Sequence, residues 1–397
     1  MTKVYLDHAG TTPIRREVFE AMVPYLTENF GNASTLYSYG REAKKALENS
    51  RENVAAIIGA NPEEIFFTSG GTESDNWAIR GIALANRKHG NHIVTSSIEH
   101  PANLYTCQDL EKQGYKITYI PVDEHGLVNV DSVINAVTDE TILVSIMHAN
   151  NEIGTIQPIA EIGNALKSLK KNNLYFHTDA VQSVGKINVD VNDLNVDLLS
   201  ISSHKLYGPK GVGALYIRKG TQIKPYLTGG AQENKNRAGT ENIPAIVGFG
   251  KAVELISQEI DIEYERLLHL RDKLIDGIMA EIPFVRLNGH RDLRLPHNVN
   301  ICLEFVEGES LLFNLDMKGI CASSGSACSS GSLAPSHVLL ALGIPPEIAQ
   351  GSLRMTLGRD NTEEEIDYVI KTLPKIVERL RAMSPLFAEK KACPKRV

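Results

Sequence analysis

The sequence predicts an α/β protein with a large domain built on a mostly parallel sheet and a smaller α+β domain. Between residues 65 and 217, short apolar runs typical of buried strands alternate with helical patterns, as they do in parallel sheets covered by helices. Beyond that region the alternation stops. At 397 residues the chain exceeds what one hydrophobic core usually supports. We assign residues 14–258 to the large domain, residues 1–13 and 259–386 to the small domain, and residues 387–397 to a flexible tail.

Composition argues against several classes of protein. The net charge of -7 argues against nucleic acid as the main partner. No run approaches the length of a membrane span and the N-terminus has no apolar secretory segment, so we expect no membrane association and a cytoplasmic location. The five cysteines form no C-x-x-C pair, and neither a metal site nor a disulfide framework is expected.

The large domain is expected to begin after a short strand at 4–6 and a polar turn. Apolar residues at helical spacing predict a helix over 41–58, which Gly59 ends, and a second helix over 159–169. Apolar runs predict the remaining strands at 65–69, 92–96, 117–121, 142–148, 174–177, 196–201 and 213–217.

The small domain is expected to follow a long helical stretch over 243–280, interrupted near Asp261. A strand is predicted at 298–305. The terminal helix over 363–383 carries one continuous apolar stripe, and Thr362 with Glu365 forms a capping box at its start.

Two glycines follow the strand at 65–69, where the next helix opens with Gly71 and Thr72. A glycine turn leading into a helix N-terminus offers N–H groups and partial positive charge to a phosphate. Gly-Gly before a helix is more often only a tight turn, so this motif alone leaves both readings open.

Polar residues also stand at the ends of other predicted strands, among them His100, Asn151 and Asp179. Ligands bind at the carboxyl ends of such strands. A carboxylate behind a buried strand suits a cationic partner such as a pyridinium nitrogen, and Gln182 would lie beside the same ligand. Asp179 equally fits the N-cap of a helix.

Lys205 follows the predicted strand at 196–201, behind Ser202 and His204. A buried lysine reduces its cost by losing its proton or by forming an imine, as lysines that bind aldehyde cofactors do. Hydroxyl and imidazole groups nearby would suit a phosphate. A lysine that extends from a strand end to solvent is the plain alternative.

Cys328 lies in a segment of small residues, 322–334, with almost no apolar neighbours in the sequence. Such a thiol is suited to be exposed and mobile, and therefore to attack a substrate and carry a group. An incidental cysteine in a Ser/Gly linker is the alternative. Arg354, in an alternating stretch, could bind a carboxylate with its bidentate fork or form a surface ion pair.

Together these motifs resemble the cysteine desulfurases of the NifS and IscS type, within the fold-type I pyridoxal-phosphate enzymes of the class-V aminotransferase family. The resemblance extends over almost the whole chain. It is carried by the motifs at 69–76, 177–182, 202–205, 237–242 and 323–328, in this order and spacing.

The resemblance implies a role for each site residue. Lys205 would bind the aldehyde of pyridoxal 5′-phosphate, Asp179 the pyridinium nitrogen and Gln182 the ring hydroxyl. His100 would stack on the ring and assist proton transfer, with Asn151 nearby. The phosphate would be held by Gly71, Thr72, Ser202 and His204, and by Thr240 of a neighbouring subunit in a homodimer. Arg354 and Asn32 would bind the substrate carboxylate, and Cys328 would be the nucleophile.

The reaction implied is the conversion of L-cysteine to L-alanine, with a persulfide on Cys328. Its sulfur would pass to an iron–sulfur scaffold or another acceptor protein. The chain departs from the family pattern at His8, Gly10, Ala33 and Tyr37, which is expected to alter substrate fit and to leave the reaction class intact.

Three rival functions compete with this interpretation. An aminotransferase needs no nucleophilic cysteine, so the segment around Cys328 weighs against it. A selenocysteine lyase uses similar residues and stays open. A sulfur-relay or scaffold-binding protein without turnover could lose Lys205 or Asp179, and the presence of both favours an active enzyme.

Overall fold

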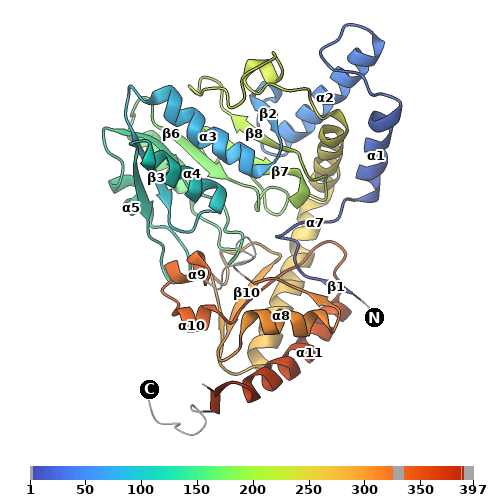
Figure 1. The fold of residues 1–397 in the computed structure, drawn as a ribbon, viewed down its shortest axis with the longest axis vertical. Coiled ribbons are helices and arrows are strands. Elements are labelled where there is room, and N and C mark those ends of the chain that lie inside the picture. The colour runs from blue at the N-terminus through green and yellow to red at the C-terminus, as the bar shows by residue number, and fades with distance from the viewer. Residues whose placement is uncertain (1–2, 325–334, 386, 389–397) are drawn as a thin grey trace.

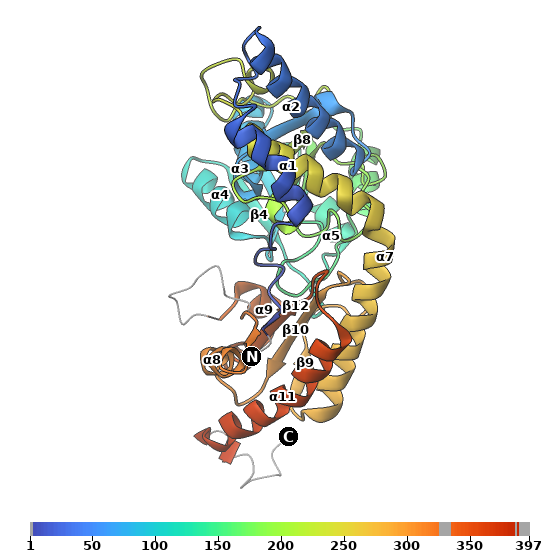
Figure 2. The ribbon, with the colours of Figure 1, turned by 90° about the vertical axis from the view of Figure 1, so that its right-hand side faces the viewer.

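The computed structural model describes residues 3–324, 335–385 and 387–388, which form two lobes (Figure 1). Cys328 and most of the predicted tail lie outside the described residues. The long helix α7 (Ile243–Glu281) runs along one side of the molecule from the upper lobe into the lower one (Figure 2). The domain limits given above stay a prediction.

The upper lobe is built on a seven-stranded sheet in the order β2-β8-β7-β6-β5-β3-β4. Only β8 runs antiparallel to its neighbours, so the sheet is mostly parallel, as predicted. The strands are β2 (Ile65–Thr68), β3 (His92–Ser96), β4 (Lys116–Ile120), β5 (Thr141–Ser145), β6 (Tyr175–Asp179), β7 (Leu198–Ser202) and β8 (Gly213–Ile217).

Helices cover both faces of this sheet, because its strands are apolar on both sides. Trp77 of α3 and Leu110 of α4 belong to the apolar core on one face. Leu47 of α2, Val133 of α5, Ile162 of α6 and Phe249 of α7 belong to the core on the other face. The helices are α1 (Arg16–Thr27), α2 (Ser38–Ala56), α3 (Gly71–Asn86), α4 (Pro101–Lys112), α5 (Val130–Asn135) and α6 (Ile159–Ser168).

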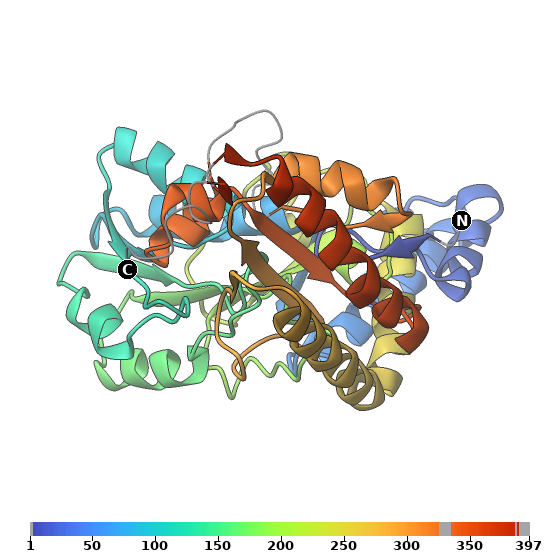
Figure 3. The same cartoon turned by 90° about the horizontal axis from the view of Figure 1, so that it is seen from below.

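The lower lobe contains a three-stranded antiparallel sheet in the order β12-β10-β9 and a parallel pair, β1 with β11. Helix α11 and the C-terminal part of α7 pack beside this sheet (Figure 3). The elements are β1 (Val4–Tyr5), β9 (Val285–Leu287), β10 (Asn298–Leu303), α8 (Gly308–Asp316), β11 (Ile320–Cys321), α9 (His337–Ala341), α10 (Pro346–Ala349), β12 (Ser352–Thr356) and α11 (Glu363–Ala382).

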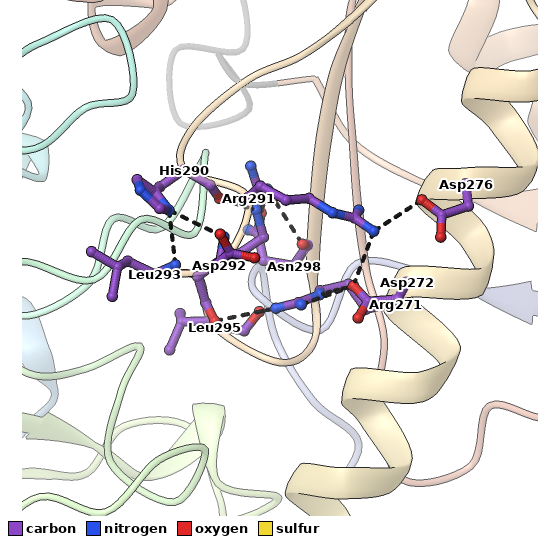
Figure 4. A network of polar contacts seen from close by, with 10 residues as sticks. Arg271, Asp272, Asp276, His290, Arg291, Asp292, Leu293, Leu295 and Asn298 are labelled. Atoms are coloured by element: carbon purple, nitrogen blue, oxygen red, sulfur yellow. Dashed lines mark hydrogen bonds and ion pairs between the residues drawn. The ribbon is translucent and has the colours of Figure 1, made fainter.

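The loop at 288–297 joins the two lobes. On the side of the upper lobe, the Leu295 N–H donates to Gly154 O at 2.9 Å. On the side of α7, Arg271 donates to Leu295 O at 3.3 Å and Arg291 pairs with Asp276 at 2.9 Å (Figure 4). The loop is therefore tied both to the upper lobe and to the helix that crosses between the lobes.

The predicted interruption of α7 near Asp261 is wrong. Helix α7 is continuous over 39 residues. Its buried side chains stop at Ile256 and resume at Leu267, because the segment between them crosses from one core to the other and is more open to solvent. The apolar pattern breaks there, whereas the backbone does not.

Among the described residues, no helix is both long enough and apolar enough to cross a membrane.

The capping box predicted at α11 is confirmed: the Thr362 side chain accepts from the Glu365 N–H at 3.3 Å, and Glu365 accepts from the Thr362 N–H. Thr362→Ala should lower the free energy of unfolding by about 1 kcal/mol, because it leaves helix N–H groups without an acceptor. The measurement is the urea midpoint. Thr27→Ala, at an exposed helix end, is the matched control and should shift it little.

Candidate active site

A cavity of about 420 Å³ lies at the carboxyl ends of the central strands of the large sheet. It gathers residues from the ends of β6 and β7, from the start of α3 and from β12 of the lower lobe. Most of the site residues predicted from the sequence line it, namely Gly71, Thr72, His100, Asn151, Asp179, Gln182, Ser202, His204, Lys205 and Arg354.

One end of the cavity is formed by the N-terminus of α3, which has no side-chain cap. Gly71 allows a close approach here, because a Cβ on it would come within 2.7 Å of Val181 Cγ2. The Ser202 and His204 side chains line the same cavity. Uncapped helix N–H groups beside hydroxyl and imidazole donors match the expected phosphate site.

Asp179, the last residue of β6, is buried and lines the cavity. Its Oδ1 accepts from the Val181 N–H at 2.9 Å, which fixes the orientation of the carboxylate. Burial raises the pKa of Asp179 to about 6, while the Val181 N–H and the charge of Lys205 lower it. A cationic partner in the cavity would favour the ionised form further.

Lys205 extends into the cavity from the turn after β7. Its Nζ donates to Ala9 O at 2.6 Å and to Gly10 O at 2.5 Å. The lysine is thus held by carbonyl groups of the N-terminal segment and does not extend to bulk solvent as the alternative interpretation supposed.

His100 is the N-cap of α4, and its Nδ1 accepts from the Ala102 N–H at 3.1 Å. Burial, reinforced by the charges of Lys205 and His337, lowers the pKa of His100 to about 4. The ring is therefore neutral near pH 7, and because Nδ1 accepts, its proton lies on Nε2. His100 can then donate a hydrogen bond into the cavity from a fixed tautomer.

Arg354, on β12, is 4% exposed and reaches the cavity from the lower lobe. Its Nη1 donates to Asn151 O at 3.0 Å and its Nη2 to Asp7 Oδ1 at 2.9 Å. The guanidinium is therefore buried, paired with Asp7 of its own lobe and hydrogen-bonded across to Asn151 of the upper lobe, and it does not form the surface ion pair that the sequence left open.

Three predicted site residues are not brought together with the others. Asn32 and Thr240 are exposed and do not line the cavity of their own chain. Cys328 lies outside the described residues. Their roles stay predictions.

The cavity also includes residues that the sequence reasoning did not single out, among them Asp7, Asp75 and Met147. Asp75 lies in the motif at 69–76, so its place was open to prediction. Burial and the charge of Asp179 raise the pKa of Asp75 well above its ordinary value. Asp7 gave no local signal, because its partner Arg354 is 347 residues away.

Comparison with known proteins decides the family. Residues 4–369 match the family described as Aminotransferase class-V. The chain is 59% identical over 383 residues to "Cysteine desulfurase IscS" of Methanosarcina thermophila, covering 96% of this chain and 94% of that relative. The chain belongs to the cysteine desulfurases.

Two solved structures extend this comparison. A cysteine desulfurase-like fold is shared with a "NIFS-LIKE PROTEIN", at 39% identity and a TM-score of 0.89, covering 95% of this chain and all of that one. A structure described as "SspA in complex with cysteine" has 37% identity and a TM-score of 0.79, covering 90% of this chain and 99% of that one.

Cysteine desulfurases of this family use pyridoxal 5′-phosphate, and the cavity fits it. An uncapped helix N-terminus is present for the phosphate, a buried carboxylate for the ring nitrogen, and an amine for the aldehyde. The described residues contain no cluster of three or more His, Cys, Asp or Glu side chains suited to hold a metal ion.

Glu152, next to Asn151, links the cavity wall to the segment before α9. It is buried and accepts from the Ser336 hydroxyl. Burial raises the pKa of Glu152 to about 7 from an ordinary 4.5, although the Ser336 hydrogen bond and the charge of Arg354 lower it. The folded chain therefore binds this proton more tightly than the unfolded chain does.

Glu152→Gln should become more stable relative to the wild type as the pH rises from about 4.5 to 7. In that window the unfolded wild type has already lost its proton, whereas the folded form must give it up, at a cost on the order of 3 kcal/mol. The measurement is the difference in urea midpoint at pH 5 and pH 8. Glu161→Gln, at an exposed glutamate, is the control. A difference that does not change with pH would contradict the assignment.

Proposed function

We propose that the protein converts L-cysteine to L-alanine with pyridoxal 5′-phosphate, and transfers the sulfur through a persulfide on Cys328. The observation that carries this proposal is the meeting of Lys205, Asp179 and Arg354 around one cavity. An amine, a buried carboxylate and a buried guanidinium match the aldehyde and the ring nitrogen of the cofactor and the carboxylate of an amino acid.

When bound, the cofactor withdraws electrons from the Cα of the amino acid and makes its proton removable. Lys205 then removes that proton, since its amine lies in the cavity beside the Ala9 and Gly10 carbonyls. Asp179 would hold a protonated ring nitrogen, and Arg354 would hold the substrate carboxylate. His100 donates from Nε2 to the reacting centre.

The nucleophile would come from the segment at 325–334, and the described residues on either side of it contact residues that line the cavity or are next to lining residues in the sequence. Ser323 pairs with Arg354 through two backbone hydrogen bonds, at 2.7 and 3.0 Å. Beyond the segment, Ser336 donates to Glu152, and His337 Nε2 lies 3.0 Å from Glu99 O. Cys328 is five residues beyond Ser323 in the sequence, and an extended chain of that length spans at most about 18 Å.

In the sulfur step, the Cys328 thiolate attacks the substrate sulfur, an S–S bond forms and the C–S bond breaks. The electron pair of that bond goes to carbon, which is protonated to give alanine. A thiol reductant or an acceptor protein then removes the outer sulfur. We propose an acceptor in iron–sulfur cluster assembly or another sulfur pathway. The cytoplasmic location stays a prediction.

We also propose a homodimer. Large apolar side chains are exposed over α1, α2 and the loop between them, including Leu26, Phe30 and Leu36. A patch of this kind in a globular protein favours burial against a partner. A second copy would also supply an environment for Thr240, which is exposed in its own chain.

The reaction is tested by the product balance of the purified holoenzyme with L-cysteine and a thiol reductant. The wild type should release sulfide and alanine in equal amounts. Lys205→Ala should reduce both by roughly a hundredfold or more, because no group remains to move the Cα proton. Cys328→Ala should abolish both, whereas Cys321→Ala, at another free cysteine, should retain them. Full sulfur release by Cys328→Ala would exclude the persulfide route.

The dimer is tested by sedimentation of the wild type and of Leu36→Asp combined with Phe30→Asp. We expect the wild type to sediment at twice the mass of the chain, and the charged variant to shift toward the monomer, because two buried charges would be unpaired at the interface. A monomeric wild type would contradict the proposal.

A further inference from the structure

We propose that Asp7 is a positioning residue, which holds Arg354 in the orientation that binds the carboxylate of the substrate. The inference rests on the proposed function, since it needs an α-amino acid whose carboxylate enters the cavity.

Arg354 is a buried cation whose side chain has few contacts that fix it. Nη1 is held by Asn151 O at 3.0 Å and Nη2 by Asp7 Oδ1 at 2.9 Å, while Nε is buried and has no hydrogen-bond partner among the described residues. Because the guanidinium is planar, fixing Nη1 and Nη2 fixes the plane in which a carboxylate is received. A long arginine side chain without these contacts loses that orientation.

Asp7 is the carboxylate that contacts this guanidinium. Glu152, whose pKa is raised by burial and lowered in part by the charge of Arg354, already accepts from the Ser336 hydroxyl. Asp7 is itself placed by backbone contacts, since it bridges to Thr356 next to the end of β12 and its carbonyl accepts from the Gly10 and Thr11 N–H groups. Its side chain is 27% exposed, so the carboxylate has room to turn into solvent if it is displaced.

Asp7 also begins the turn at 7–11, because its carbonyl accepts from the Gly10 and Thr11 N–H groups.

The same turn also holds Lys205, whose Nζ donates to the Ala9 and Gly10 carbonyls. One turn thus fixes both the arginine and the lysine. An α-amino acid carries its carboxylate and its reacting proton on the same carbon, so the arginine that binds the one and the lysine that removes the other need a constant separation. Asp7 connects Arg354 to the turn that also holds Lys205.

The test compares ligands that differ only at the carboxylate. L-Alanine and L-alaninamide are titrated into the holoenzyme, and binding is followed by the absorption of the cofactor, without turnover. Asp7→Ala should weaken L-alanine binding roughly tenfold or more and change alaninamide binding by less than about twofold. Asp7→Asn keeps an acceptor oxygen and should lie between Asp7→Ala and the wild type.

The kinetic readout should agree with the binding readout. In Asp7→Ala the KM for L-cysteine should rise by the same factor as the dissociation constant of L-alanine, while kcat falls less. The matched control is Asp109→Ala, because Asp109 lies on α4 away from the cavity and pairs with Arg80 of α3. This variant should change neither the KM for L-cysteine nor the dissociation constant of L-alanine.

Several results would overturn the proposal. If Asp7→Ala weakened the binding of both ligands equally, the role of Asp7 would be structural. If Asp7→Ala bound L-alanine more tightly than the wild type does, Asp7 would compete with the substrate for Arg354. A wild type that binds L-alanine no better than alaninamide would remove Arg354 as a carboxylate site. If the wild type distinguishes the two ligands but forms no sulfide from L-cysteine, the proposed function fails while this inference stands.

Discussion

The N-terminal segment at 9–12 is hydrogen-bonded to both lobes, and we call it the N-terminal crossing. The relative positions of the site residues depend on these hydrogen bonds. The Ala9 N–H donates to Thr356 Oγ1 at 2.8 Å, and the Thr12 N–H donates to His204 O at 3.0 Å. The Gln182 amide donates to Ala9 O at 3.1 Å. The lysine and the arginine come from different lobes, and this short segment sets their relative position.

Burial determines the charge of the groups below the cavity. It raises the pKa of Glu99 to about 7, with opposing hydrogen bonds from Ser96, the Met147 N–H and Asn103. It lowers the pKa of His148 to about 4 and that of His177 to about 3. The histidines are thus neutral near pH 7, and few uncompensated charges surround Asp179. The electric field of the Asp179 carboxylate can therefore act on a cation in the cavity with little screening.

Much of the large sheet was predictable, because its strands are uninterrupted apolar runs and their carboxyl ends meet at one edge. The limits of β3 and β8 were predicted as observed. The same rule predicted that His100, Asp179 and Lys205 would meet. The continuity of α7 was not predicted, because its middle lies between two hydrophobic cores. Few side chains are buried there, so the apolar pattern is interrupted although the helix is not. The contact between Asp7 and Arg354 was not predictable, because it joins residues far apart in the chain and leaves no periodic pattern in the sequence.

The unbroken α7 has a mechanical consequence. A helix of 39 residues is about 58 Å long. Because every turn of it is closed by hydrogen bonds, it acts as a stiff strut between the lobes and offers no point of easy bending. Rotation of one lobe against the other would instead strain the N-terminal crossing and the loop at 288–297. We therefore expect an amino acid to enter through movements of side chains at the cavity and not through rotation of one lobe against the other.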